Sequence, residues 1–212
     1  RIDTYVKEGE TFVKVVDYKT GNPDITMADV YYGLSLQLLV YLDESLALCG
    51  ENETASIPAG TFYFHVDDPV VKEKIKDPEL LQKKIDQAFQ MNGLFLDDPR
   101  VMNALDEDNG RSSDIFKKGS RTNKLSRDEF EDILDYVKWI IADSVKGIEK
   151  GDIALKPYKM GSKCACDFCD YRAVCQWDSQ IDQAAYRVLD AAVSKAQLLK
   201  RAREVTGHEL DR

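Results

Sequence analysis

The stretch Val15-Val16-Asp17-Tyr18-Lys19-Thr20-Gly21 places an acidic and a basic residue at the end of a predicted β-strand. It closes a run over residues 11–19 in which polar and apolar residues alternate and Val, Tyr and Phe are frequent, as in a strand. Thr20-Gly21-Asn22-Pro23 has the composition of a turn and ends that strand. Because side chains two residues apart on a strand share a face, Asp17 and Lys19 are expected to point the same way.

A carboxylate and an ammonium group at one strand end suit the hydrolysis of a phosphodiester bond. The carboxylate of Asp17 could hold Mg²⁺, with the main-chain carbonyl of Tyr18 as a further ligand. Lys19 could orient the attacking water or offset charge in the transition state. The same two residues also occur as an ordinary ion pair on protein surfaces, and Asp-x-Lys alone does not separate the two interpretations.

Residues 28–48 are predicted to form a helix, because their apolar residues recur near helical spacing. Gln37 and Tyr41 are four residues apart and therefore share a face of this helix. They lie in the otherwise apolar run Leu34–Tyr41, where a polar side chain needs a partner or a wet cleft. The alternative is a glutamine at the core edge that bonds to a backbone group.

Residues 2–7 form another alternating run, and the break Glu8-Gly9-Glu10 predicts a hairpin with residues 11–19. The loop length leaves the register open. If residue 6 pairs with residue 11, Asp3 lies opposite Lys14, away from Asp17. If residue 7 pairs with residue 11, Asp3 shares the face of Asp17 and becomes a candidate metal ligand.

Further along the chain, the sequence predicts a third strand over 60–66, in which His65 is expected to be a hydrogen-bonded sheet residue. A helix is predicted to start at Asp77-Pro78-Glu79. Three more segments are predicted in chain order: a polar, weakly periodic insertion over 91–125, a helix over 126–150 opened by a Ser126–Glu129 capping box, and a final helix over 179–205.

Composition narrows the possible classes of protein. The chain has 212 residues, 43% of them hydrophobic, which is enough for one domain with its own core. Lys and Arg number 29 against 38 Asp and Glu, a net charge of −9, so a protein that coats DNA non-specifically is not expected. The chain contains no run of about 18 apolar residues, so a membrane span is not expected. The chain begins at Arg1, and we expect it to be a fragment of a longer protein.

Four of the five cysteines, Cys164, Cys166, Cys169 and Cys175, lie close together, and the fifth is Cys49. This odd, crowded set favours intracellular thiols that bind a metal over a secreted disulfide framework. Spacing alone suits either zinc, which it slightly favours, or a [4Fe–4S] cluster.

Three segments in order carry a resemblance to a known family: Arg1-Ile2-Asp3, Val16-Asp17-Tyr18-Lys19-Thr20-Gly21 and Tyr32-Gly33-Leu34-Ser35-Leu36-Gln37-Leu38-Leu39-Val40-Tyr41. Together they resemble the RecB-like branch of the PD-(D/E)xK nucleases, most of all the AddB-type component of AddAB helicase–nucleases. The pattern Cys166-x-x-Cys169-x-Tyr-x-x-Val-Cys175 resembles the C-terminal cysteine staple of the same proteins.

The resemblance implies a restriction-endonuclease-like α/β fold, a mixed sheet flanked by helices with a C-terminal cysteine segment and helix. It implies a single nuclease domain over 1–212, with a hairpin, helix and strand in 1–66, a helical region in 67–150, and the cysteine segment and last helix in 151–212. Asp17 would be a Mg²⁺ ligand and Lys19 the catalytic lysine, while Gln37 and Tyr41 would contact the active site or the DNA strand. In the family pattern Gly-x-Ile-Asp-Arg-Ile-Asp, Asp3 matches the second Asp, whereas the usual ligand is the first.

By the same resemblance, Cys166, Cys169 and Cys175 would bind a [4Fe–4S] cluster whose fourth ligand lies upstream, with Cys164 a bystander. The substrate would be single-stranded DNA at duplex ends in the cytoplasm, processed for recombinational repair beside an AddA-type helicase–nuclease subunit. ATP-driven unwinding would belong to other segments, because this chain has no Walker-type loop. The fragment by itself is expected to have little activity. The alternatives are a non-catalytic cysteine-stapled scaffold that contacts DNA or a partner, and a zinc-ribbon enzyme of other chemistry.

Overall fold

The computed structural model describes residues 1–21, 24–50, 56–66, 75–105, 123–181 and 186–207. Its centre is a five-stranded mixed sheet in the order β1 (Ile2–Lys7), β2 (Glu10–Lys19), β3 (Ser56–His65), β4 (Asn92–Leu96) and β5 (Lys124–Leu125). The pairs β1/β2 and β3/β4 are antiparallel, and β2/β3 and β4/β5 are parallel. The predicted mixed α/β sheet is confirmed.

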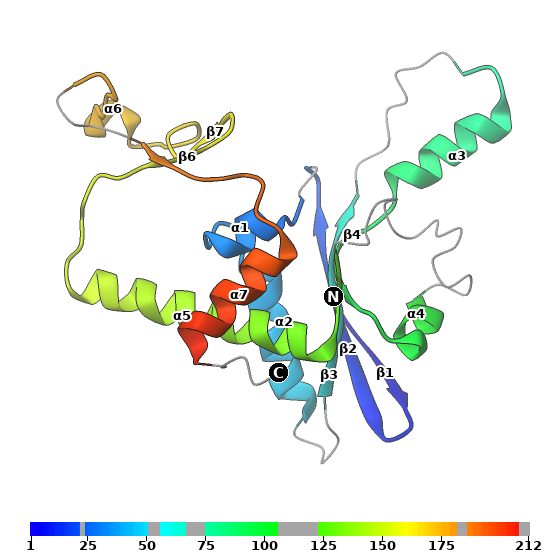
Figure 1. The fold of residues 1–212 in the computed structure, drawn as a ribbon. Coiled ribbons are helices and arrows are strands. Elements are labelled where there is room, and N and C mark those ends of the chain that lie inside the picture. Colours follow the sequence, from blue (N-terminus) through cyan, green and yellow to red (C-terminus); the bar gives the residue numbers. More distant parts are fainter. Residues whose placement is uncertain (22–23, 51–55, 67–74, 106–122, 182–185, 208–212) are drawn as a thin grey trace.

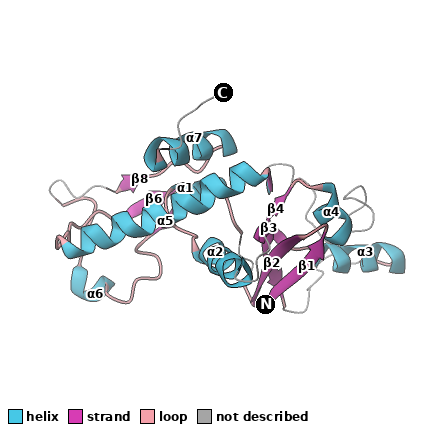
Figure 2. Ribbon diagram, turned by 90° about the horizontal axis from the view of Figure 1, so that it is seen from below, coloured by secondary structure: helices cyan, strands magenta, loops and turns pink. Residues whose placement is uncertain are grey.

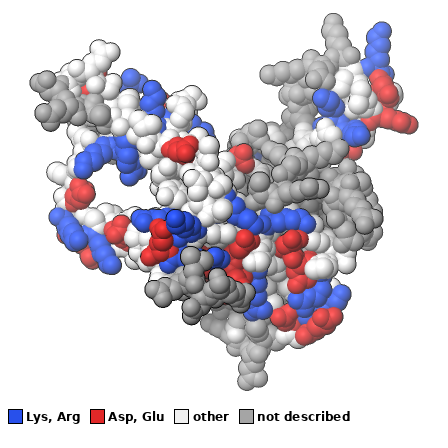
Figure 3. All heavy atoms as spheres, viewed as in Figure 1, with Lys and Arg blue, Asp and Glu red and all other residues white. Residues whose placement is uncertain are grey.

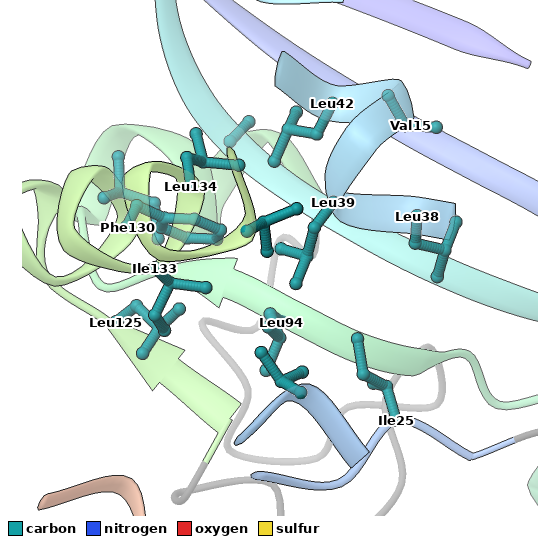
Figure 4. Close-up of a cluster of buried hydrophobic side chains, with 14 of the residues drawn as sticks. Val15, Ile25, Leu38, Leu39, Leu42, Leu94, Leu125, Phe130, Ile133 and Leu134 are labelled. Carbon is teal, nitrogen blue, oxygen red and sulfur yellow. The ribbon is translucent and has the colours of Figure 1, made fainter. Parts of the chain in front are cut away.

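Helices cover both faces of this sheet (Figure 1). On one face lie α1 (Met27–Tyr31), α2 (Gln37–Gly50), α5 (Arg127–Glu149) and α7 (Lys195–Thr206); on the other lie α3 (Pro78–Ala88) and α4 (Pro99–Leu105). The main core forms where α2 and α5 meet the sheet. Figure 4 shows Leu38, Leu39 and Leu42 of α2 packed near Phe130 and Ile133 of α5. Burial of these apolar side chains fixes α2 against β2 and β3.

The first hairpin turns through Glu8 and Gly9, both with positive φ, 54° and 79°. Two-residue turns of this kind match the twist of the strands they join. Val6 pairs with Thr11 and Asp3 with Lys14. The register is therefore the one that places Asp3 away from Asp17.

The prediction of a single helix over 28–48 is wrong, because the helix is interrupted between α1 and α2. Gly33 has φ +74°, and the Leu34 N–H donates back to the Asp29 carbonyl at 2.7 Å while the Gly33 N–H donates to Val30. This is a Schellman ending, which needs a residue in the left-handed region after the helix. The break redirects the chain so that α2 starts at Gln37.

Other boundaries follow local signals. Asp77 caps α3, its side chain accepting from the Glu79 N–H at 3.0 Å, and the capping box of Ser126 and Glu129 is present at the start of α5. His65 is a hydrogen-bonded sheet residue, as predicted, with Nδ1 2.6 Å from the Gly21 carbonyl.

Two predicted segments need correction. The weakly periodic insertion over 91–125 contains β4, α4 and β5 within its described part, and residues 106–122 lie outside the described residues. The final helix predicted over 179–205 is only α7, from Lys195, preceded by the short strand β8 (Arg187–Val188).

The described residues between α5 and α7, which we call the cysteine segment, form a small second sheet with the order β7 (Lys163–Cys164), β6 (Tyr158–Met160) and β8. Helix α6 (Arg172–Cys175) lies between β7 and β8 in the chain. Figure 1 shows β6, β7 and α6 set apart from α5, with a loop joining the two parts, and Figure 2 shows the same segment at the side of the molecule away from the main sheet. Its buried apolar contacts are few: Met160 and Leu189 pack with Ala28 of α1. Among the described residues, no helix is long and apolar enough to cross a membrane.

Candidate active site

Asp17 and Lys19 lie at the C-terminal end of β2, on the face that α2 covers. Lys19 Nζ lies 2.8 Å from Asp17 Oδ2, so the two side chains form an ion pair. As expected from strand geometry, they project side by side.

Gln37 and Tyr41 join this pair through hydrogen bonds. Lys19 Nζ donates to Gln37 Oε1 at 3.3 Å, and Gln37 Nε2 donates to Tyr41 Oη at 3.1 Å. A continuous polar chain therefore runs from the carboxylate of Asp17 to the phenol of Tyr41. The structure brings together all four residues that the sequence singled out for one site.

The first turn of α2 is held in place by its apolar face. Leu38 and Leu39, the two residues after Gln37, are fully buried. The carbonyl of Leu38 accepts a hydrogen bond from Thr61 Oγ1 on β3 at 3.2 Å. With its neighbours fixed in this way, the backbone of Gln37 is held next to β2, and its exposed side chain reaches Lys19.

The charge on Lys19 is stabilised by its surroundings. The hydrogen bond with Asp17 is the largest cause of a raised Lys19 pKa, with a smaller contribution from the electrostatic interaction with Asp17 and with the phenols of Tyr63 and Tyr41, against the lowering effect of burial. The side chain therefore remains an ammonium ion at neutral pH, which suits a group that faces phosphate oxygens.

Sequence reasoning missed Tyr63 and Ser35 at this site. Tyr63 pairs with Asp17 across the parallel strands, and its ring centroid is 6.0 Å from Lys19 Nζ. Ser35 Oγ, in the turn before α2, lies 3.5 Å from Tyr63 Oη. The only sequence signal for Tyr63 is its place in an aromatic run of β3, and the pairing with β2 that brings it to the site is not local.

The donors at the end of β2 fit a hard divalent cation. Asp17 Oδ2 is a buried carboxylate oxygen whose contact with Lys19 leaves lone-pair capacity for a metal ion. The Lys19 carbonyl accepts from the Val66 N–H, on the β3 side of β2. By strand alternation the Tyr18 carbonyl then points to the β1 side, next to Asp17. Within the described ranges, however, no three His, Cys, Asp or Glu side chains gather into a metal site.

Asp3 does not share this site. Its carboxylate pairs with Lys14 Nζ at 3.1 Å and with Arg1 Nε at 2.7 Å, on the opposite face of the sheet. These contacts, the hydrogen bond from Arg1 foremost, lower the Asp3 pKa. The prediction of Asp3 as a metal ligand is therefore corrected by the hairpin register, which places it opposite Lys14.

The cysteines lie apart from the polar chain at β2. Cys164 and Cys166 are half-buried, Cys169 and Cys175 are exposed, and all four are free thiols. The Cys166 N–H donates to Cys164 Sγ at 3.3 Å. Burial, and then interactions with Cys164, Cys169 and Cys175, raise the pKa of Cys166. Cys49 is a half-buried thiol on α2, far from them in sequence.

A carboxylate, a lysine and a helix-borne glutamine meet at the end of the mixed sheet, an arrangement compatible with metal-dependent phosphodiester hydrolysis. A family model described as the PD-(D/E)XK nuclease superfamily matches residues 1–176. The chain belongs to this superfamily and is a nuclease domain, which confirms the predicted fold class and enzyme class.

Curated relatives point to one kind of protein, the B subunit of an ATP-dependent helicase/deoxyribonuclease. The relative from Clostridium kluyveri is 39% identical over 202 residues, 90% of this chain and 18% of the relative. The protein of the same name from Alkaliphilus oremlandii is 34% identical over 96% of this chain and 19% of the relative. The protein of the same name from a Thermoanaerobacter species is 36% identical over 88% of this chain and 17% of the relative. The chain thus spans less than a fifth of the length of these relatives.

Proposed function

We propose that this chain is the Mg²⁺-dependent nuclease domain of an AddB-type component of a bacterial helicase–nuclease. Its substrate is single-stranded DNA at duplex ends, which the whole enzyme processes for recombinational repair beside an AddA-type subunit in the cytoplasm. The observation that carries the proposal is the hydrogen-bonded chain from Lys19 through Gln37 to Tyr41, with Asp17 beside it. The similarity to helicase/deoxyribonuclease proteins supports the wider setting.

In this proposal each residue has a separate task. Asp17 and the Tyr18 carbonyl hold Mg²⁺, which when bound supplies charge stabilisation and an acidified water. Lys19 orients the attacking water and offsets charge on the phosphate. Gln37 fixes the ammonium group of Lys19 through its Oε1 atom, and Tyr41 orients the amide of Gln37.

The test compares Asp17→Asn and Lys19→Gln with Asp3→Asn in the full-length protein and its partner subunit. Asp3 is a matched control, because it is an ion-paired aspartate on the neighbouring strand that faces the other way. We expect the Asp17 and Lys19 variants to lose roughly 10²–10³-fold in the single-turnover rate of DNA cleavage, without loss of DNA binding. Asp3→Asn should cleave nearly as the parent does.

The rival function, a scaffold that only contacts DNA or a partner protein, gives the opposite result. If this domain were a scaffold, Asp17→Asn and Lys19→Gln would leave DNA degradation by the enzyme unchanged. The cleavage would then come from another part of the enzyme, and the nuclease role proposed for this chain would fail.

We also propose that the cysteine segment holds a [4Fe–4S] cluster through Cys166, Cys169 and Cys175, with the fourth donor from another part of the full-length protein. The chemistry of the donors supports this, because four cysteines lie within one short segment of the sequence. In the described part of the chain, these three cysteines do not gather into a group that could hold a metal ion. Anaerobic purification of the full-length protein followed by iron, sulfide and zinc analysis tests it. Stoichiometric zinc without iron would contradict the cluster.

A further inference from the structure

Three aromatic rings follow one another on the face of the sheet opposite Asp17 and Lys19. The rings of Tyr18 on β2 and Phe64 on β3 meet edge to face, with centroids 5.7 Å apart and planes at 70°. Phe64 is in turn nearly parallel to Phe89 at the end of α3, with centroids 6.3 Å apart and planes at 13°. We call Tyr18, Phe64 and Phe89 the aromatic row.

The row is open to solvent, unlike the aromatic pair further along the same sheet. Phe62 and Phe95 are stacked at 6.4 Å and are 0% and 2% exposed, sealed by Met102. Tyr18 is 45% exposed and Phe89 36%. Phe64, between them, is half-buried. Packing buries Phe62 and Phe95, whereas the rings of Tyr18 and Phe89 remain exposed to water, as at an interaction surface.

The row is continuous with the candidate active site. Tyr18 lies in sequence between Asp17 and Lys19, and its side chain projects from the opposite face of the last residues of β2. Because β2 ends at Lys19, a ligand chain that passes this end of the sheet can reach both faces. The guanidinium group of Arg1 donates to Tyr18 Oη at 3.2 Å and is well exposed, while its Nε pairs with Asp3 at 2.7 Å, so a cation lies beside the aromatic rings.

A surface of exposed aromatic rings beside a cation, next to a phosphodiesterase site, suits single-stranded nucleic acid. Every base has a π-face that stacks on an aromatic side chain, and the phosphates seek the positive charge. Such stacking tolerates any sequence, as an enzyme that degrades DNA ends requires. A folded protein partner would supply no phosphate for the adjoining site.

We infer that the aromatic row is a stacking platform for one or two bases of the single strand whose phosphate lies at Asp17 and Lys19. The inference rests on the proposed nuclease function and adds to it the surface that holds the strand next to the scissile bond. Tyr18, Phe64 and Phe89 bind bases, whereas Asp17 and Lys19 act on the phosphate and Gln37 holds Lys19.

The first experiment measures cleavage of single-stranded oligonucleotides in which one base at a time is replaced by an abasic site. With the full-length enzyme, the cleavage rate at limiting DNA should fall by about tenfold when the abasic site occupies one or two fixed positions from the cut. In Phe89→Leu that position-specific difference should disappear, and Phe89→Tyr should restore it. Tyr5→Leu is the matched control, an exposed aromatic residue at the other end of the hairpin that packs on Phe12.

The second experiment does not depend on cleavage. A single-stranded oligonucleotide with one 5-iodouracil is bound in Ca²⁺, irradiated, and the crosslinked peptides are identified by mass spectrometry. Crosslinks to Phe64, Phe89 or Tyr18, absent at Tyr5, are the expected result. Crosslinks confined to other segments, or equal sensitivity to abasic sites in the parent and Phe89→Leu, would overturn the platform. If crosslinks form at the row while Lys19→Gln still cleaves normally, the platform stands and the nuclease assignment fails.

Discussion

The end of β2 and the cysteine segment differ in how much of the molecule supports them. Behind Asp17 and Lys19 lie Leu38 and Leu39, both 0% exposed, in the largest core cluster. In the cysteine segment, Phe168 and Val174 are 98% and 84% exposed. Figure 3 shows an opening between this segment and the distal part of α5. One region is held by its own core, and the other by few buried contacts.

This difference indicates two ways of building a functional region. Side chains at the sheet end are positioned by the folding of the domain, so they meet without any bound group. The cysteines come from a segment with little apolar burial, for which binding of a metal or cluster can supply the missing stabilisation. The proposals for the two regions can therefore be tested separately.

The largest expected effect is on the core that supports the site. Leu39→Ala should lower the free energy of unfolding by about 2–5 kcal/mol, because it removes fully buried atoms and leaves a cavity under α2. Leu48→Ala on the same helix, where the side chain is 64% exposed, should change it by less than about 0.5 kcal/mol. Denaturant unfolding measures both. Equal effects would show that α2 is not anchored through Leu39.

A smaller effect is expected at the break between α1 and α2. Gly33→Ala should destabilise by about 1–2 kcal/mol, because Gly33 has φ +74° and an added Cβ would lie 3.1 Å from Ile140 Cγ2. Gly147→Ala is the matched change inside α5, where a Cβ meets nothing within 4 Å. It should stabilise by up to about 1 kcal/mol. Thermal unfolding that shifted in the same direction for both variants would argue against a required left-handed residue at position 33.

The cysteine segment should respond locally. Replacing Cys166 and Cys169 by Ser in the full-length protein should remove most of the bound iron. Hydrogen exchange should accelerate in β6 and α6 and stay unchanged in α2, because few buried contacts join the two regions. Mass spectrometry of the exchanged peptides measures this difference. Faster exchange throughout the sheet would show that the segment supports the core after all.

The smallest effect concerns the charge of Asp98 on the α4 side of the sheet. The hydrogen bond from Arg100 lowers the Asp98 pKa, so the carboxylate stabilises the fold at neutral pH and loses this contribution as the pH falls through its lowered pKa. Asp98→Asn should therefore cost about 1 kcal/mol or less at pH 7, and the difference from the parent should shrink in acid. Melting temperatures across pH test the sign, and a difference that widened in acid would contradict it.

Local sequence patterns were sufficient to predict which side chains of the site share a face of the same strand or helix. The pairing of Asp17 with Lys19 follows from strand alternation, and that of Gln37 with Tyr41 from helix spacing. The capping box at Ser126 also depends only on neighbouring residues. The family resemblance added that these two pairs meet, which the ion pair and hydrogen bonds among them bear out.

Features that depend on distant partners could not be predicted. The apolar spacing of 28–48 runs on through Gly33, which hides the helix ending that the left-handed conformation of Gly33 makes there. The strand β4 was not expected, because Gly93 is an unusual strand residue. A Cβ at Gly93 would come within 2.0 Å of the Thr61 carbonyl, so glycine is required by the close approach of β3. The hairpin register that keeps Asp3 away from Asp17 depends on the two-residue turn at Glu8 and Gly9, and the sequence is compatible with another turn length.

A double-mutant cycle on Lys19 and Gln37 tests most directly whether the side chains at the end of β2 act as one catalytic unit. Lys19→Ala, Gln37→Ala and the double variant are compared in the full-length enzyme by single-turnover cleavage of single-stranded DNA. If Gln37 acts by holding the ammonium group of Lys19, as the 3.3 Å hydrogen bond indicates, the double variant should be no slower than Lys19→Ala alone. Losses that multiply would mean that the two residues act independently, and would contradict this account of the site.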